Sequence, residues 1–204
     1  MTPWMYSKIK KGDIRSMRKV LQLLSIVVVG IAVALMLISP ELVLIFGSPK
    51  YREAVYVIPP VAASVFFIFI YNILSMPQFY YEKTQFLMAA SMAAAGANVV
   101  LNFIFIRLFG YIAAGYTTLA CYMLYSVGHY IVSKQILVNE GIQENLMNPG
   151  FLLACSVFLI GASIICNLIF PYRILRYAIL LASAGLVFWK KELLLKTMAD
   201  IRKK

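Results

Sequence analysis

Residues 89–118, AASMAAAGANVVLNFIFIRLFGYIAAGYTT, predict a hairpin of two apolar helices with a tight turn at 108–110. On the first helix, residues four apart share one face, namely Ala90, Ala94, Asn98 and Asn102. The second helix repeats this spacing with Gly110, Ala114 and Thr118. In a bilayer, small residues let two helix backbones approach closely, and amides can hydrogen-bond across the contact. We therefore expect this hairpin to lie in a membrane.

The composition of the whole chain supports a membrane location. Of the 204 residues, 62% are hydrophobic and 13% are charged, and the mean hydropathy is +0.84. Soluble domains are less apolar and carry about twice that share of charge. The net charge of +11 raises the alternative of a nucleic-acid-binding protein. However, the basic residues gather at helix ends and tails, which is typical of anchoring against anionic lipid and predicts no nucleic-acid partner.

Six apolar segments predict an all-α polytopic membrane protein with one six-helix transmembrane domain, residues 20–189. Pro40 and Glu41 are expected to end the first segment, and 42–46 to form a short half-buried turn. Pro59 and Pro60 are expected to bend the second segment near its start. A basic segment, 1–19, precedes the domain, and a basic amphipathic tail, 190–204, is expected to continue as a helix along the surface. The predicted spans are about 20–39, 55–76, 86–106, 111–132, 150–170 and 177–189.

The distribution of basic residues predicts the orientation of these spans. With six spans, both termini lie on the same side as the turns at 77–85 and 133–149. That side carries fourteen of the 19 Lys and Arg residues, and the opposite side carries five. Because cytoplasmic loops are enriched in Lys and Arg, both termini are expected in the cytoplasm.

Residue patterns for catalysis are weak. His129 is the only histidine, and a lone histidine near a helix end is commonly an interfacial or hydrogen-bonded residue. Ser163 invites comparison with intramembrane serine proteases, but it follows the histidine and lacks their Gly-x-Ser-Gly motif. No span holds a pair of acids, and no Cys-x-x-Cys pair or glycine-rich phosphate loop occurs. We expect no enzyme activity, no metal and no cofactor.

The polar residues within the spans are mostly amides and hydroxyls, whose usual role is to hold helices together. For Asn98 and Asn102, a second interpretation is that they line a wet cavity. Arg107 lies at the outer end of the third span. Its side chain is expected either to reach the lipid–water interface or to face a phosphate-bearing ligand.

Several motifs follow one another in a specific order. A basic segment and a first span are followed by PELVLIFG (40–47), KYREA (50–54) and a proline-bearing span. Then come EKT (82–84), NVVLNFIFI (98–106) and FGYIAA (109–114). This order resembles the C-terminal part of bacterial oligosaccharide and polysaccharide flippases. Their superfamily also includes the multidrug (MATE) exporters and the lipid II flippases. The resemblance covers residues 1–133, and the last two spans agree with it only in number.

The resemblance implies one lobe of a MATE-like two-lobe transporter. Such proteins move lipid-linked saccharide across the inner membrane by alternating access to a central cavity. Asn102 matches the family's usual asparagine, Lys83 and Thr84 a common Lys-Thr turn, and Gly110 the Phe-Gly turn. The family's Gly-Ala-Ala is replaced here by residues 113–115, Ala-Ala-Gly, so the helix contact at this point is expected to be shifted.

The resemblance also implies partners and site residues. The expected substrate is a lipid-linked oligosaccharide of the polyprenyl pyrophosphate type, used for surface polysaccharide such as O-antigen. A separate N-terminal half, or self-association, is expected to complete the cavity. Asn98 and Asn102 are expected to face or brace the cavity, with Lys83 and Arg107 near its mouths.

Two other functions remain open. A drug exporter of the same superfamily would usually carry an acid inside a span, and this chain has none. A non-transporting membrane scaffold or fragment is also consistent with the sequence.

Overall fold

The computed structural model describes residues 1–189, and every element in that range is a helix. The predicted tail at 190–204 lies outside the described residues. The helices, in chain order, are α1 (Thr2–Lys10), α2 (Ile14–Phe46), η1 (Pro49–Val57, a 3₁₀ helix), α3 (Ile58–Leu74), α4 (Met76–Tyr80), α5 (Gln85–Phe109), α6 (Ala113–Asn139), α7 (Pro149–Ile169) and α8 (Arg173–Trp189). The all-α prediction is confirmed for this part of the chain.

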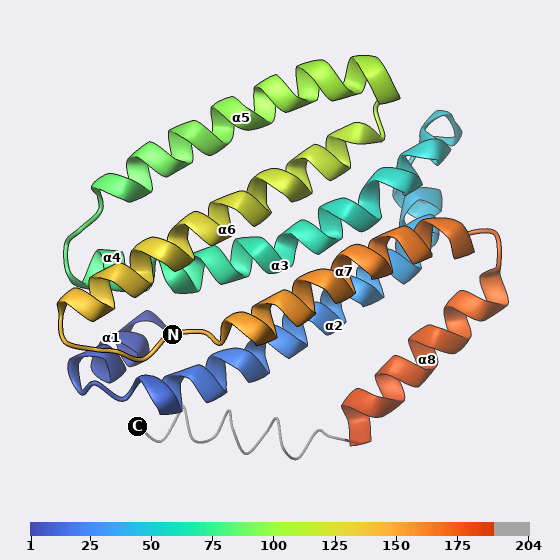
Figure 1. Ribbon diagram of the computed structural model, residues 1–204. Coiled ribbons are helices and arrows are strands. Elements are labelled where there is room, and N and C mark those ends of the chain that lie inside the picture. The colour runs from blue at the N-terminus through green and yellow to red at the C-terminus, as the bar shows by residue number, and fades with distance from the viewer. Residues whose placement is uncertain (190–204) are drawn as a thin grey trace.

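The long helices form a row (Figure 1). α6 packs between α3 and α5, α2 and α7 pack on α3 and on each other, and α8 packs on α2 and α7. α5 therefore lies at one edge of the row and α8 at the other. The short helices α1 and α4 pack together at the end that holds the N-terminus.

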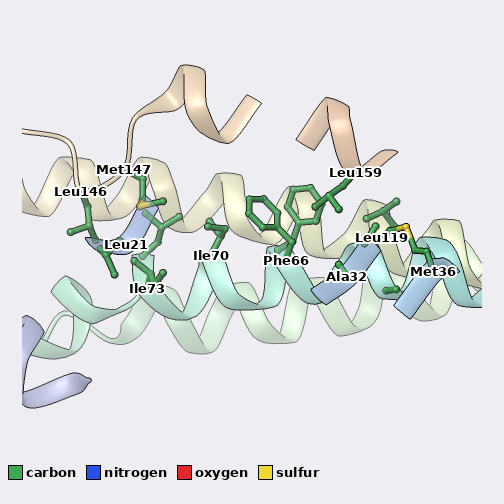
Figure 2. Packing of buried hydrophobic residues seen from close by; sticks show 14 of the residues in the cluster. Leu21, Ala32, Met36, Phe66, Ile70, Ile73, Leu119, Leu146, Met147 and Leu159 are labelled. Carbon is green, nitrogen blue, oxygen red and sulfur yellow. The ribbon is translucent and has the colours of Figure 1, made fainter. Parts of the chain in front are cut away.

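The core is centred on α3, where ten of 17 residues are buried. Phe66, Ile70 and Ile73 pack within one cluster with α2 residues such as Met36 and with Leu159 of α7 (Figure 2). In contrast, no residue of α5 is buried. The edge helix is therefore attached to the bundle mainly through its contact with α6.

Four of the described helical segments are long and apolar enough to cross a membrane: Ile14–Phe46, Lys50–Tyr80, Gln85–Phe109 and Pro149–Ile169. Several such helices are compatible with a multi-pass membrane protein. α6 is not among them, because tyrosines, hydroxyls and His129 lower its hydropathy, and the described part of α8 has 17 residues.

The prediction that Pro40 and Glu41 end the first helix is wrong. Pro40 lies inside α2, which continues to Phe46, so the expected half-buried turn at 42–46 is also helical. Proline cannot donate a backbone hydrogen bond to the carbonyl four residues earlier, here that of Met36. The Ser39 hydroxyl donates to the Met36 carbonyl instead, at 2.8 Å. This substitute donor lets the helix continue through the proline.

An ion pair joins the end of α2 to the start of α8. Both terminal nitrogens of Arg176 bind the Glu41 carboxylate, at 2.8 and 2.9 Å. One of them also donates to the Leu37 carbonyl at 2.7 Å. The Arg176 side chain is only 3% exposed, and Tyr177 donates to Glu41 as well. This contact, which the sequence analysis did not predict, holds the edge helix α8 against α2.

Pro59 and Pro60, which were predicted to bend the second span near its start, lie where a 3₁₀ helix gives way to an α-helix. They occupy the first turn of α3, which begins at Ile58 after η1. Backbone N–H groups in a first helical turn have no acceptor within the helix, so proline costs little there. The prolines thus start the helix instead of distorting it.

The predicted hairpin is confirmed. α5 and α6 pack against each other, and Gly110 joins them with φ +76°. Residues with a side chain rarely adopt this conformation, so the turn favours glycine. The helix α6 ends later than the predicted span, at Asn139, because residues 133–139 continue the helix instead of belonging to the loop. α8 likewise starts at Arg173, within the predicted turn at 171–176.

Candidate functional site

The two asparagines of the hairpin form one hydrogen-bonded group. Asn102 donates from Nδ2 to Asn98 Oδ1 at 2.9 Å, one turn away on α5. Thr117 of α6 donates its hydroxyl to Asn102 Oδ1, so the group joins the two helices. Thr117 is 6% exposed, which places this contact inside the hairpin. Asn102 therefore holds α5 and α6 together, which is the usual role of an amide within a span.

Asn98 also lines a pocket of about 460 Å³ between α3, α5 and α6. We call it the tyrosine pocket and define it by its polar lining: Tyr71, Ser91, Asn98, Thr118, Tyr122 and Tyr125. Alanines 94 and 95, Val99 and Cys121 complete the lining. None of the lining residues carries a charge at neutral pH. The pocket thus combines aromatic faces with neutral hydrogen-bonding groups.

Contacts among the lining residues hold the rings in place. The Tyr71 ring stacks on Tyr122 with centroids 6.3 Å apart and an interplanar angle of 6°, and it lies 4.7 Å from the Tyr125 ring. The hydroxyl groups of Ser91 and Tyr125 are 2.7 Å apart. Such contacts restrict the rings, so a ligand that touches them would order them at little further entropic cost.

Lys83 and Arg107 lie at opposite ends of α5, away from the asparagines. Lys83, in the turn before α5, forms an ion pair with Glu140 at 2.8 Å and so joins that turn to the end of α6. Arg107 is exposed, and its guanidinium carbon lies 3.9 Å from the centroid of the Phe103 ring one turn earlier. The structure thus brings Asn98 and Asn102 together, but it places neither Lys83 nor Arg107 beside them.

The tyrosines and Ser91 were not predicted as site residues. A signal was present, because Ser91 and Asn98 are seven residues apart, as are Thr118 and Tyr125. This spacing places each pair on one helix face. Tyr71 could not be found in this way, since it comes from α3 and meets the hairpin only through tertiary packing.

His129 is fully buried and hydrogen-bonded, which agrees with one of the two roles suggested for it. The Gln78 amide nitrogen lies 2.7 Å from His129 Nδ1. Ser163, the residue that invited comparison with a protease, donates its hydroxyl to the Ile160 carbonyl on its own helix. Each of the two residues thus has a separate structural partner.

Among the described residues, no group of three or more His, Cys, Asp or Glu side chains could hold a metal ion. The two other pockets with a described lining are mainly apolar. One lies between α3, α6 and α7, and the other between α5 and α6. Of these three pockets, all lined by described residues, the tyrosine pocket is the best suited to binding a polar molecule.

Comparisons of the chain with protein-family models, with curated proteins and with solved structures find no match.

Proposed function

We propose that this protein is one lobe of a transporter that moves a lipid-linked oligosaccharide across the bacterial inner membrane for surface polysaccharide synthesis. In this proposal, α2, α3, α5, α6, α7 and α8 all cross the membrane, and both termini lie in the cytoplasm. α6 crosses it in contact with α3 and α5, so that its polar residues face protein or the tyrosine pocket. Polar groups on such a helix need protein or water contacts.

The observation that carries the proposal is the chemistry of the tyrosine pocket. A sugar ring has an apolar C–H face and a rim of hydroxyl groups, so it fits an aromatic face beside neutral donors and acceptors. Tyr71, Tyr122 and Tyr125 supply the faces, while Asn98, Ser91 and Thr118 supply amide and hydroxyl groups. This lining suits an uncharged saccharide better than a drug-like cation, because no carboxylate is present among the lining residues.

The position of α5 supports a lobe with a missing partner. None of its residues is buried, although the helix is 25 residues long. Asn98 and Ser91 are on its polar side, facing α3 and α6 across the pocket. In the proposal, a second lobe, supplied by a separate chain or a second copy, covers this edge and closes the cavity.

The pyrophosphate of the substrate would not bind inside the tyrosine pocket, because a buried anion needs cationic or N–H partners. Arg107, exposed at the end of α5, is the proposed contact for it on one side of the membrane. The lipid tail would remain in the bilayer. Transport would follow from switching between two packings of the lobes that differ by a few kcal/mol.

Gene disruption in the bacterium of origin tests the proposal. The expected result is loss of surface polysaccharide, with accumulation of the lipid-linked saccharide on the cytoplasmic side. Wild-type protein and a Met92→Leu control, altered at a residue of α5 that is 76% exposed, should both restore the polysaccharide. Asn98→Leu, which removes an amide from the pocket, should restore it at least about tenfold less well, equivalent to about 1.4 kcal/mol.

An unchanged amount of surface polysaccharide after disruption would overturn the transport proposal and favour a scaffold. Equal rescue by Asn98→Leu and Met92→Leu would show that the tyrosine pocket has no part in transport. Protein amounts in the membrane must be matched between variants by immunoblotting.

A further inference from the structure

A second polar cluster lies behind the tyrosine pocket, where α4 meets α6. It consists of Gln78, His129 and Ser133, each at most 1% exposed. Three of their polar atoms are buried without a hydrogen-bond partner: Gln78 Oε1, His129 Nε2 and Ser133 Oγ. A buried donor or acceptor without a partner costs about 1–3 kcal/mol. The cluster is thus an unfavourable arrangement in the conformation described.

The Gln78–His129 contact has two hydrogen-bonding states. When the imidazole is neutral with a free lone pair on Nδ1, the Gln78 amide donates to it across 2.7 Å. Gln78 Oε1 then has no partner, as observed. When a proton binds Nδ1, the imidazole becomes a donor, and rotation of the amide by half a turn brings Oε1 into position to accept. Gln78 Nε2 then takes the place that Oε1 held, so proton binding reverses the direction of this hydrogen bond without lowering the number of unpaired polar atoms.

Aromatic rings surround the imidazole. The ring centroids of Tyr125, Phe86 and Tyr71 lie 4.5, 5.4 and 5.8 Å from that of His129. Aromatic rings attract a cation within about 6 Å through their negative faces. Phe86 comes from α5, Tyr71 from α3, Tyr125 from α6 and Gln78 from α4. Among these four groups, the tyrosines are titratable and none is charged at neutral pH. The Tyr71 ring lies at 31° to the imidazole plane, and the Tyr125 and Phe86 rings lie at 90° and 79° to it, so the Gln78 carbonyl is the acceptor proposed for the protonated ring.

The same tyrosines line the tyrosine pocket. Tyr71 and Tyr125 each contact His129 and also form part of the pocket wall. A charge on the imidazole therefore acts on two rings that a pocket ligand would touch. If proton binding changes ligand affinity, ligand binding must change proton affinity by the same factor.

We propose that His129 and Gln78 form a proton-binding site that communicates with the tyrosine pocket through Tyr71 and Tyr125. The site takes up one proton at His129 Nδ1, which then donates to Gln78 Oε1. The proposal concerns the chain by itself and does not require that it transport a saccharide.

Nuclear magnetic resonance of the full chain in lipid nanodiscs tests the site, because His129 is the only histidine and gives one set of imidazole signals. With labelled histidine and tyrosine, the ¹⁵N and ¹³C signals of His129 are followed between about pH 4 and pH 8. The expected result is a single titration of the imidazole, accompanied at the same midpoint by shifts of the Tyr71 and Tyr125 ring signals. Signals of Tyr51, an exposed residue of η1, serve as a control and should not move at that midpoint.

Variants of Gln78 distinguish a proton site from a purely structural contact. Gln78→Glu places a carboxylate beside Nδ1 and should move the midpoint up by at least about one pH unit, whereas Gln78→Leu removes the acceptor and should move it down. The exposed Gln85→Leu is the matched control and should leave it unchanged. Imidazole signals that do not change with pH, or a midpoint that is the same in all variants, would overturn the proposal. A titration without movement of the tyrosine signals would overturn the link to the pocket.

Discussion

At the scale of single residues, the Arg176 side chain both donates a hydrogen bond to the backbone of α2 and forms an ion pair with that helix. Pro40 removes a donor from α2, and Ser39 and Arg176 bind two successive carbonyls beside it, those of Met36 and Leu37. Arg176 also carries the bidentate contact with Glu41. Planar guanidinium fits this geometry better than the ammonium group of lysine.

Replacing Arg176 by glutamine should therefore destabilise the protein by about 3 kcal/mol, because the Leu37 carbonyl would lose this donor and Glu41 would keep a hydrogen bond only from Tyr177. The measurement is unfolding in mixed micelles with increasing SDS. Arg173→Gln is the control, since its side chain is 67% exposed and its nitrogen lies 3.9 Å from Glu41. We expect a change within about 0.5 kcal/mol for this control. Equal effects of the two variants would contradict a special role for Arg176.

At the scale of helices, the close approach of α6 to the start of α3 depends on Gly115. A Cβ atom at this position would lie 2.8 Å from Pro60 Cγ and 2.9 Å from the Val57 carbonyl oxygen. Gly115 therefore lies at the point where the backbone of α6 meets the residues at the start of α3.

Gly115→Ala should destabilise the bundle by about 1–3 kcal/mol, because the proline ring and the backbone must move apart. Gly96→Ala on α5 is a matched control, since its added Cβ would meet no atom within 4 Å. That change should be neutral or stabilise the helix by up to about 1 kcal/mol. Thermal unfolding of both variants in the same detergent compares them. A stable Gly115→Ala would show that the helices can separate without cost.

The two sides of α5 should differ in their contact with water. Asn98→Cys points to the tyrosine pocket, and Met92→Cys replaces a side chain that is 76% exposed on the apolar side. In a background with Cys121, Cys155 and Cys166 changed to alanine, a water-soluble maleimide should label Asn98→Cys at least about tenfold faster, because a thiol covered by lipid or by the second lobe is away from water and is not ionised. Equal labelling, or faster labelling of Met92→Cys, would contradict a hydrated pocket.

At the scale of the whole molecule, side-chain interactions hold the loops together at each end of the bundle. Lys83–Glu140 and Arg18–Glu144 join the α4–α5 turn, the α6–α7 loop and the start of α2 at one end. At the other end, Tyr111 donates to Glu53, and Glu41 binds Arg176. Six of the 19 Lys and Arg residues follow residue 189. Of the other Lys and Arg residues, eight lie at the first end and five at the second. Such an imbalance is typical of a membrane protein whose first end faces the cytoplasm.

Single cysteines tested in intact cells should confirm this orientation. A membrane-impermeant maleimide should label Lys50→Cys in η1 and leave Gln143→Cys in the α6–α7 loop unlabelled until the cells are opened. Both positions are exposed, so accessibility within the fold is matched. The opposite pattern would place the N-terminus outside the cytoplasm.

The sequence by itself determined the all-α class, the approximate places of most long helices and the α5–α6 hairpin. These depend on local information: runs of apolar residues, helical spacing and a glycine at a turn. Asn102 could be identified as a polar helix contact for the same reason, since its neighbours Asn98 and Thr117 are close in the sequence.

Only the tertiary structure decided which residues from distant helices meet. Pro40 was expected to end its helix because the sequence does not reveal that Ser39 and Arg176 provide donors to the carbonyls near it. Tyr71 joins the pocket, and Gln78 meets His129, 51 positions later in the chain, through the packing of α3 and α4 on α6. Such contacts depend on how whole helices pack, and no local pattern records that packing.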